Sequence, residues 1–364
     1  MINTAVVIPC LNPDDRMVDY VRALSDQGFA KIIVVNDGSA EEFDSFFARA
    51  ESFRGCVVLR HVENRGKGCA LKTAMKYYLD SVTDCNGIIT ADADGQHTLE
   101  DAVNISRLMT SMDDALILGS RDFSQDDVPA RSRFGNRCTS VVFKLAHGSY
   151  LRDTQTGLRG IPNKLIPIFA DLRGERYEYE MNMLIECSRR NIKMVEEPIK
   201  TVYIDDNSSS HFKVFRDSGK IYWIILRDLF MYILSGVISF VVDQGLYILM
   251  FYLLLPRLFG ASPEDNSLLW IAIAAGVARV CSSLLNYFLN KRLAFRNTDK
   301  GTNSLLKYAL LVVLVLATSS LLVWILTSIT PIPKIVIKPI VDLVLVFINY
   351  SIQRTWVFKP ASES

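Results

Sequence analysis

The sequence has few histidines and cysteines, and they are widely separated. Its four histidines do not follow metal-ligand spacing. The seven cysteines show neither the paired spacing of a zinc site nor close pairs, as expected of reduced cytosolic thiols. The formal net charge is only +1, which argues against broad nucleic-acid binding. Together these features argue against a disulfide-rich secreted domain, a zinc module and a nucleic-acid binder.

The N-terminal stretch MINTAVVIPCLN also lacks the features of a signal peptide. It has no basic start, no long apolar core and no small-residue cleavage site. We interpret it as the first strand of a folded domain, and we expect that domain to stay in the cytoplasm.

Charged residues are scarce between residues 230 and 358, where four long apolar runs follow one another. Each run approaches or exceeds the roughly 20 residues that cross a bilayer as a helix. The runs are Phe230–Leu255, Leu268–Leu289, Leu305–Ile329 and Ile335–Ile352. We predict four transmembrane helices rather than a buried soluble bundle, because soluble helices seldom run this long without a polar face.

An even number of spans places both termini on the cytoplasmic side of the plasma (inner) membrane. Basic residues before the first span and between the second and third spans support this orientation, whereas Lys334 and Lys338 fall in the predicted outer loop. Ser210–Arg227 mixes aromatic and basic residues, as in a helix lying in the membrane interface; the alternative is a linker continuing into the first span. We therefore predict a soluble domain over residues 1–209, an interfacial helix or linker over 210–229, and a transmembrane domain over 230–360.

Strand-like and helix-like segments alternate in the soluble half. Short β-branched runs occupy Ala5–Pro9, Lys31–Val35, Val57–His61 and Gly87–Thr90, and helical patterns occupy Arg16–Gln27, Glu41–Ser52 and Lys67–Leu79. This alternation predicts an α/β fold with a doubly wound, mostly parallel sheet. Ligands of such sheets bind at the carboxyl ends of the strands, so polar residues that follow the strands are candidates for the site.

The segment TADADGQH, residues 90–97, is the most informative of these strand ends. Asp92 and Asp94 follow an apolar strand, and two carboxylates at this spacing can share a divalent cation with the oxygens of a bound diphosphate. An ordinary polar loop that caps the next helix would look the same in isolation. The motif therefore needs support from the rest of the chain.

That support comes from motif order. VVIPCLN, VVNDGS, ENRGKGCALKTAM, TADADGQH, LGSRDF and DTQTGLRG occur in this order over about residues 1–215. The order and spacing resemble family 2 glycosyltransferases of GT-A fold, in particular the dolichol-phosphate mannose synthase and polyprenyl-phosphate glucosyltransferase branch. The resemblance implies transfer of a hexose from a UDP- or GDP-linked sugar to a polyprenyl phosphate, for cell-envelope glycosylation.

The resemblance also implies a nucleotide base pocket lined by Pro9, Leu11, Val35 and Asp37, with Lys67 near it. The dolichol enzymes have tyrosine and glutamate where this chain has Leu11 and Pro13, so the base stays open between uracil and guanine. Asn36 likewise replaces the first aspartate of the usual pair.

By the same resemblance, Asp92, Asp94 and Gln96 hold a divalent metal, Mg²⁺ or Mn²⁺, and the donor diphosphate. Arg121 and one arginine of RSRFGNR bind the acceptor phosphate. We favour Arg133 over Arg131 and Arg137, and a surface ion pair is the alternative for each arginine.

The sugar-facing turn of the family corresponds to Asp153, Gln155, Thr156 and Arg159, and Glu180 is a second-tier substrate-binding candidate. Glu180 could equally be a partner of a helix N-terminus. The arginine that the family has before the membrane is missing, so His211, Lys213 or Arg216 is expected to supply its charge. Of the four histidines, only His97 and His211 are expected near the chemistry.

The residue types agree with the implied reaction. A lipid phosphate monoester, with a second pKa of about 6, is largely anionic at neutral pH and can attack the anomeric carbon without a strong protein base. Arginines position it, and the metal offsets charge on the leaving nucleoside diphosphate. Direct attack would invert the anomeric centre.

The apolar half contains an internal repeat. Asn286–Arg296 aligns without gaps to Asn349–Lys359 at an offset of 63 residues. Residues 230–360 resemble the GtrA-like four-helix family, whose members accompany lipid-phosphate glycosyltransferases. Because an unpaired charge inside a span is costly, we predict that Arg279 is neutralised by Asp243, Asp342 or both.

Two other functions stay open. A processive polysaccharide synthase usually carries a QxxRW motif after the acidic turn, and the soluble half has none. The second alternative is a membrane translocator or assembly factor with an inactive transferase domain. The intact Asp92, Asp94, Lys67 and Arg121 argue against this alternative. The expected partners are the nucleotide sugar, polyprenyl phosphate and the lipid bilayer, and homo-oligomerisation is left open.

Overall fold

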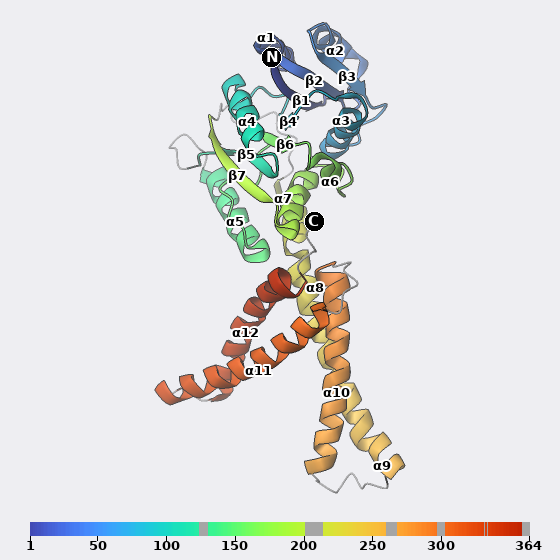
Figure 1. Cartoon of the computed structure of the whole chain (residues 1–364), viewed down its shortest axis with the longest axis vertical. Helices are drawn as coiled ribbons and strands as arrows, with labels where there is room; N and C mark the ends of the chain where they lie inside the picture. The colour runs from blue at the N-terminus through green and yellow to red at the C-terminus, as the bar shows by residue number, and fades with distance from the viewer. Residues whose placement is uncertain are drawn as a thin grey trace. The chain divides into compact units, whose positions relative to one another are not determined.

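The structure is a computed structural model that describes residues 1–123, 130–200, 214–259, 268–296, 303–330, 332 and 334–358. The chain divides into two compact units, Met1–Ile225 and Leu226–Ser364 (Figure 1). The first unit contains a mixed α/β layer structure and the second contains long apolar helices.

A seven-stranded sheet forms the centre of the first unit. Its strand order is β3-β2-β1-β4-β6-β5-β7, and β6 is antiparallel to both neighbours while the other pairs are parallel. The strands are β1 (Ile2–Cys10), β2 (Phe29–Asn36), β3 (Cys56–Arg60), β4 (Gly87–Thr90), β5 (Ala115–Arg121), β6 (Arg159–Pro162) and β7 (Lys193–Ile199). The predicted mostly parallel α/β fold is confirmed, together with all four predicted strands.

Helices cover both faces of this sheet. One face carries η1 (Glu41–Phe43), α1 (Asp15–Gln27), α2 (Asp44–Glu51) and α4 (Leu99–Ser111), and the other carries α3 (Lys67–Ser81), α5 (Ala130–His147), α6 (Ile166–Ala170) and α7 (Glu178–Arg190). Alternate residues of β1 supply both cores: Val6 and Ile8 face the first group, and Ala5 and Val7 face the second. This period of two, with apolar residues at every position, is typical of a strand buried on both faces.

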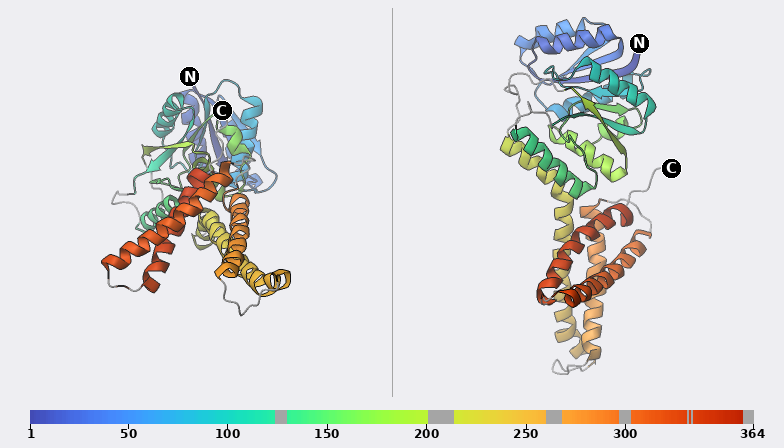
Figure 2. Two further views of the ribbon diagram at one scale, coloured as in Figure 1. Left: turned by 60° about the horizontal axis from the view of Figure 1, so that its bottom comes forward. Right: turned by 90° about the vertical axis from the view of Figure 1, so that its left-hand side faces the viewer.

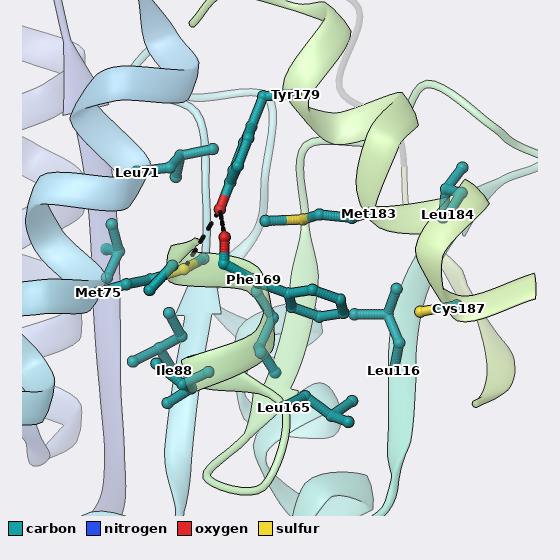
Figure 3. Packing of buried hydrophobic residues seen from close by; sticks show 14 of the residues in the cluster. Leu71, Met75, Ile88, Leu116, Leu165, Phe169, Tyr179, Met183, Leu184 and Cys187 are labelled. Atoms are coloured by element: carbon teal, nitrogen blue, oxygen red, sulfur yellow. Dashed lines mark hydrogen bonds between the residues drawn. The ribbon is translucent and has the colours of Figure 1, made fainter. Parts of the chain in front are cut away.

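Tyr179 anchors helix α7 to the core beneath α3 and α6. Its hydroxyl donates a hydrogen bond to the carbonyl oxygen of Phe169 at 2.7 Å, next to the sulfur of Met75 at 3.5 Å (Figure 3). The ring is completely buried among aliphatic side chains. Because a buried hydroxyl needs a partner, this bond fixes the start of α7 and with it the next residue, Glu180.

A single helix, α8 (Val214–Leu249), joins the two units without interruption. Ile221 and Ile225 are buried in the core of the first unit, and the imidazole of His147 lies 3.1 Å from the carbonyl oxygen of Ile225. The two compact units therefore divide after Ile225, inside the helix, whereas the predicted domain limits stand at residues 209 and 230. The physical reason is that apolar side chains of the expected linker pack onto the soluble core.

In the part of the chain that the structure describes, four helices are long and apolar enough to cross a membrane. They cover Gly219–Leu258, Leu269–Ala294, Asn303–Ile329 and Val336–Val357. The helical segments after α8 are η3 (Met250–Leu254), α9 (Leu255–Phe259), α10 (Leu268–Leu289), η4 (Asn290–Ala294), α11 (Asn303–Ile329), α12 (Lys334–Ile352) and η5 (Gln353–Val357). The four predicted spans are confirmed.

The internal repeat is visible as a pair of equivalent helix ends. Helices α10 and α12 both finish in a five-residue π-helical turn, η4 and η5, whose first residues are Asn290 and Gln353, 63 positions apart. These two residues contact each other: Asn290 Nδ2 donates to Gln353 Oε1 at 3.0 Å. The rings of Phe295 and Phe358, also 63 apart, stack with centroids separated by 5.1 Å. The two helical hairpins (Figure 2) thus meet through equivalent residues.

Tyrosine and asparagine contacts around this joint repeat as well. Tyr308 on α11 donates to Asn286 at 2.8 Å, and Asn349 donates to Tyr232 on α8 at 2.9 Å. Asn286 and Asn349 are again 63 positions apart. The sequence repeat is therefore a structural duplication, and its polar groups satisfy one another within an apolar unit.

Arg279 pairs with one of its two predicted partners. Its Nη2 lies 3.3 Å from Asp243 Oδ2, and Ser282 donates to the other oxygen of this buried carboxylate at 2.8 Å. Asp342 pairs instead with Lys338 at 2.5 Å, one helical turn earlier on α12. The prediction is confirmed for Asp243, while Asp342 uses the nearer lysine because i,i+4 residues share a helix face.

Candidate active site

The residues expected to line a base pocket lie together at the carboxyl ends of β1 and β2. Pro9 and Val35 are register partners in these parallel strands, and the backbone N–H of Asp37 donates to the carbonyl oxygen of Cys10 at 2.8 Å. Leu11 follows at the half-buried start of the next loop. The structure therefore brings Pro9, Leu11, Val35 and Asp37 to one edge of the sheet.

Asp37 is buried, and its carboxylate organises the loop that leads into α3. It accepts hydrogen bonds from the backbone N–H groups of Arg65 and Gly66 at 3.0 and 2.8 Å. Its Oδ1 also lies 2.7 Å from Nδ1 of His61, whose other ring nitrogen reaches Thr73 at 2.9 Å. The expectation that only His97 and His211 lie near the chemistry is thus wrong for His61. Its place directly after β3, at a strand end, was the signal that pointed to it.

Lys67 links the acidic turn to α7. Its ammonium lies 2.6 Å from Asp92 Oδ1 and 3.0 Å from Glu180 Oε1. The ring of His97 approaches the second oxygen of Asp92 at 3.4 Å. Burial raises the pKa of Asp92, but Lys67 and His97 outweigh it and hold that pKa below its usual range. Asp92 is therefore an ionised carboxylate bound to a protein cation, not a simple helix cap.

Asp94 and Gln96 lie two and four residues farther along this turn. The backbone N–H of Gln96 donates to Asp94 Oδ1 at 3.0 Å, and Gly95 between them has a φ of +78° that favours glycine. Within the described ranges, no group of three or more His, Cys, Asp and Glu side chains could hold a metal ion. Two carboxylates and an amide oxygen nevertheless suit Mg²⁺ or Mn²⁺, and Lys67 shows that a cation is accommodated at Asp92.

Gly157 lets the segment 153–159 pass directly against the acidic turn. A Cβ at Gly157 would lie 2.2 Å from Asp92 Oδ2. The carbonyl oxygen of Gly157 also accepts a hydrogen bond from the Thr90 hydroxyl at 2.7 Å. Only glycine fits here, so the two segments are held in contact at the end of β4.

The other end of the same segment contacts Arg121. Its Nε lies 2.6 Å from Asp153 Oδ2 and its Nη2 lies 3.1 Å from Oδ1, which makes a two-bonded ion pair with a fully buried carboxylate. Glu196 on β7 holds this turn by accepting from the backbone N–H groups of Arg152 and Asp153 at 2.6 and 3.2 Å. Nothing in the sequence singled out Glu196, because its role depends on the pairing of β5 with β7.

Two predicted residues of this segment differ in their surroundings. Gln155 is exposed and free to face a ligand, whereas Arg159 is completely buried. Arg159 donates to the carbonyl oxygens of Thr156 and Glu180 at 2.9 and 2.6 Å. The side chain of Arg159 thus fastens the segment to α7, because β6 carries it into the core, and its expected sugar contact stays a prediction.

The arginines of RSRFGNR, one of which is expected at the acceptor phosphate together with Arg121, lie on α5. Arg133 and Arg137 are exposed and one helical turn apart, so they share a face. The side chain of Arg131 lies outside the described residues, as do His211, Lys213 and the side chain of Arg216. Arg133 stays the favoured prediction.

Comparison with known proteins gives two family matches. Residues 5–167 match the glycosyl transferase family 2 model, and residues 231–358 match the GtrA/DPMS transmembrane domain. An uncharacterized protein of Methanocaldococcus jannaschii is 31% identical over 229 residues, covering 62% of this chain and 92% of that protein.

Two named relatives share the soluble half. The UDP-N-acetylglucosamine–dolichyl-phosphate N-acetylglucosaminyltransferase of Methanococcus voltae is 26% identical, over 58% of this chain and 92% of the relative. A dolichyl-phosphate β-glucosyltransferase of Drosophila melanogaster is 26% identical, over 63% of this chain and 74% of the relative. Both relatives act on a dolichyl phosphate, as their names state.

Proposed function

Because the chain belongs to glycosyl transferase family 2, we propose that it transfers one hexose from a UDP- or GDP-linked sugar to a polyprenyl phosphate. The observation that carries the proposal is the segment Asp153–Arg159, which contacts Asp92 through Gly157 and Arg121 through Asp153. One short segment thus lies between a carboxylate that could hold a donor diphosphate through a metal and an arginine suited to an acceptor phosphate. Close, oriented reactants are what a two-substrate transfer requires.

The donor is proposed to lie along the strand ends, with its base near Pro9, Val35 and Asp37. Asp92, Asp94 and Gln96 would hold a divalent metal together with diphosphate oxygens. The metal, when bound, would offset charge on the departing nucleoside diphosphate. Lys67, beside Asp92, adds a positive charge near the proposed position of the diphosphate oxygens.

The acceptor phosphate is proposed to bind Arg121 with Arg133 of α5. Asp153 holds the Arg121 guanidinium at a fixed angle, so the arginine can orient an anion without itself moving. A phosphate monoester with a second pKa of about 6 is already a nucleophile at neutral pH, so no protein base is needed. Direct attack on the anomeric carbon inverts its configuration.

The transmembrane domain makes the chain an integral membrane protein, which suits a lipid acceptor. We propose that the transferase unit and both termini are cytoplasmic and that the product, a polyprenyl-phosphate sugar, serves cell-envelope glycosylation. The excess of basic residues before the first span and between the second and third spans supports this orientation.

The test is transfer of labelled sugar to undecaprenyl phosphate by the full-length protein, with Mg²⁺ or Mn²⁺ and with EDTA. Asp94→Asn should lower transfer by about a hundredfold or more, a typical loss for one electrostatic contact to a transition state. Asp113→Asn, at an exposed carboxylate paired with Lys164, is the matched control and should keep full activity.

Two results would contradict the proposal. Transfer that is unaffected by Asp94→Asn would remove the metal role, and no transfer with any donor would favour a non-enzymatic membrane protein. Product anomeric configuration, read by NMR, tests inversion. Thermal shifts with UDP and GDP identify the base, because the tighter ligand raises the melting midpoint further.

A further inference from the structure

Lys67 occupies a cation position between two carboxylates from different elements. Its ammonium is 2.6 Å from Asp92 Oδ1 and 3.0 Å from Glu180 Oε1, and its side chain is only 19% exposed. Asp92 follows β4, Glu180 belongs to α7, and Lys67 opens α3. The ammonium thus supplies Asp92 with a positive charge from the protein itself.

The backbones on both sides of this ammonium are fixed. Gly66, just before Lys67, has a φ of +94°, and Asp37 accepts its backbone N–H. The backbone of Glu180 is held by the buried Arg159, which donates to its carbonyl oxygen at 2.6 Å. The movable part is therefore the four-carbon stem of Lys67, whose ammonium can exchange partners without any change in the fold.

A divalent cation on Asp92 and the ammonium of Lys67 cannot both keep their places without cost. They carry like charges and compete for the same carboxylate oxygens in a poorly solvated site. A bound nucleoside diphosphate changes this balance, because its anionic oxygens offer Lys67 a new partner within the same site. Glu180 remains as the second partner in either arrangement.

We propose that Lys67 is an internal cation that occupies Asp92 until the donor binds, and that its release couples metal binding to nucleotide binding. This inference rests on the proposed function, in which Asp92 holds the metal. Metal alone then binds weakly, because it must displace Lys67. Bound nucleotide raises the affinity of the protein for the metal, and bound metal raises the affinity for the nucleotide by the same factor, as linkage requires.

The test is Mn²⁺ binding to the full-length protein in detergent, measured from the EPR signal of free Mn²⁺, without nucleotide and with UDP or GDP. Lys67→Met should bind Mn²⁺ without nucleotide about fivefold more tightly or better, within the usual range of such couplings. The extra affinity conferred by nucleotide should shrink by a similar factor. Lys67→Arg keeps the charge and should behave as the wild type.

Lys76→Met is the matched control, since it removes an exposed lysine of the same helix α3. It should leave both Mn²⁺ affinities unchanged. Lys67→Met binding Mn²⁺ as the wild type does, or more weakly without nucleotide, would overturn the inference. A melting curve of each variant shows that it is folded, and Lys67→Gln, which also removes the charge, takes the place of the methionine variant if that variant is not.

Asp92→Asn separates this inference from the proposed function. If it abolishes nucleotide-dependent Mn²⁺ binding while Lys67→Met matches the wild type, the metal role of Asp92 stands and the role of Lys67 falls. If the wild type binds no Mn²⁺ with either nucleotide, the metal part of the proposed function falls and the inference falls with it.

Discussion

Arg121 and Asp153 form a two-bonded ion pair at the end of β5, with N–O distances of 2.6 and 3.1 Å. Asp153 is fully buried, so its charge depends on this arginine and on the backbone around it. The arginine, at 25% exposure, is the member of the pair that can meet a ligand. The carboxylate is therefore a positioning group, and the guanidinium is the group proposed to touch the acceptor.

Asp153→Asn should weaken acceptor binding specifically. The asparagine keeps the shape but loses the charge-assisted bonds, which are worth about 1.5–3 kcal/mol, and Arg121 is then free to turn away. We expect the KM for polyprenyl phosphate to rise about tenfold or more, with the KM for the nucleotide sugar nearly unchanged. Steady-state kinetics with each substrate varied in turn measures both. A rise confined to the donor KM would contradict this assignment.

The sequence was sufficient to predict those residues of the site whose positions depend on local contacts or on the ends of the parallel strands. Asp92, Asp37 and Pro9 could be placed because parallel strands end at one edge of the sheet. The burial of Arg159 could not be predicted, because it depends on β6 entering the sheet antiparallel between β4 and β5. The contact of Gly157 with Asp92 was likewise not visible, since it depends on the approach of two backbones 65 residues apart.

The fold shows the same division. Alternating strand and helix patterns predicted the elements and their class, and long apolar runs predicted the spans. The division of the compact units after Ile225 was not predicted, because Ile221 and Ile225 belong to a continuous helix yet pack on the soluble core. Hydrophobicity alone does not distinguish side chains that pack on a protein core from side chains that face lipid.

Gly157→Ala should disable the acidic turn without unfolding the protein. The added Cβ would meet Asp92 Oδ2 at 2.2 Å, so the carboxylate must move from its present position. Displacement of a reacting group by about 1 Å can cost about a hundredfold in rate, and we expect a loss of that order in transfer. Gly219→Ala is the control, because a Cβ there meets open space on helix α8. Equal activity of the two variants would show that the Asp92 position is not critical.

The acid limb of the activity profile should belong to the acceptor and not to Asp92. Burial raises the pKa of Asp92, but Lys67 and His97 lower it by more than burial raises it. The carboxylate therefore stays ionised until the pH falls through that depressed pKa. The lipid phosphate gains a proton below about pH 6 and loses its nucleophilic dianion. We expect kcat/KM for the acceptor to fall about tenfold per pH unit below this value. An acceptor with a less acidic alkyl phosphonate in place of the phosphate should shift the limb to higher pH. A limb that does not move when the acceptor is changed would exclude this explanation.

Arg279→Leu should destabilise the membrane unit, and a second substitution should reverse the effect. Asp243 is 7% exposed, and without Arg279 its side-chain partners among the described residues are the Ser282 hydroxyl and the neighbouring Gln244 amide. An unpaired buried polar group costs about 1–3 kcal/mol, so the melting midpoint in detergent should fall. Arg279→Leu with Asp243→Asn removes the stranded charge and should recover most of the loss, since the two residues interact directly. A double variant that melts no higher than the single one would show that Arg279 acts through other contacts.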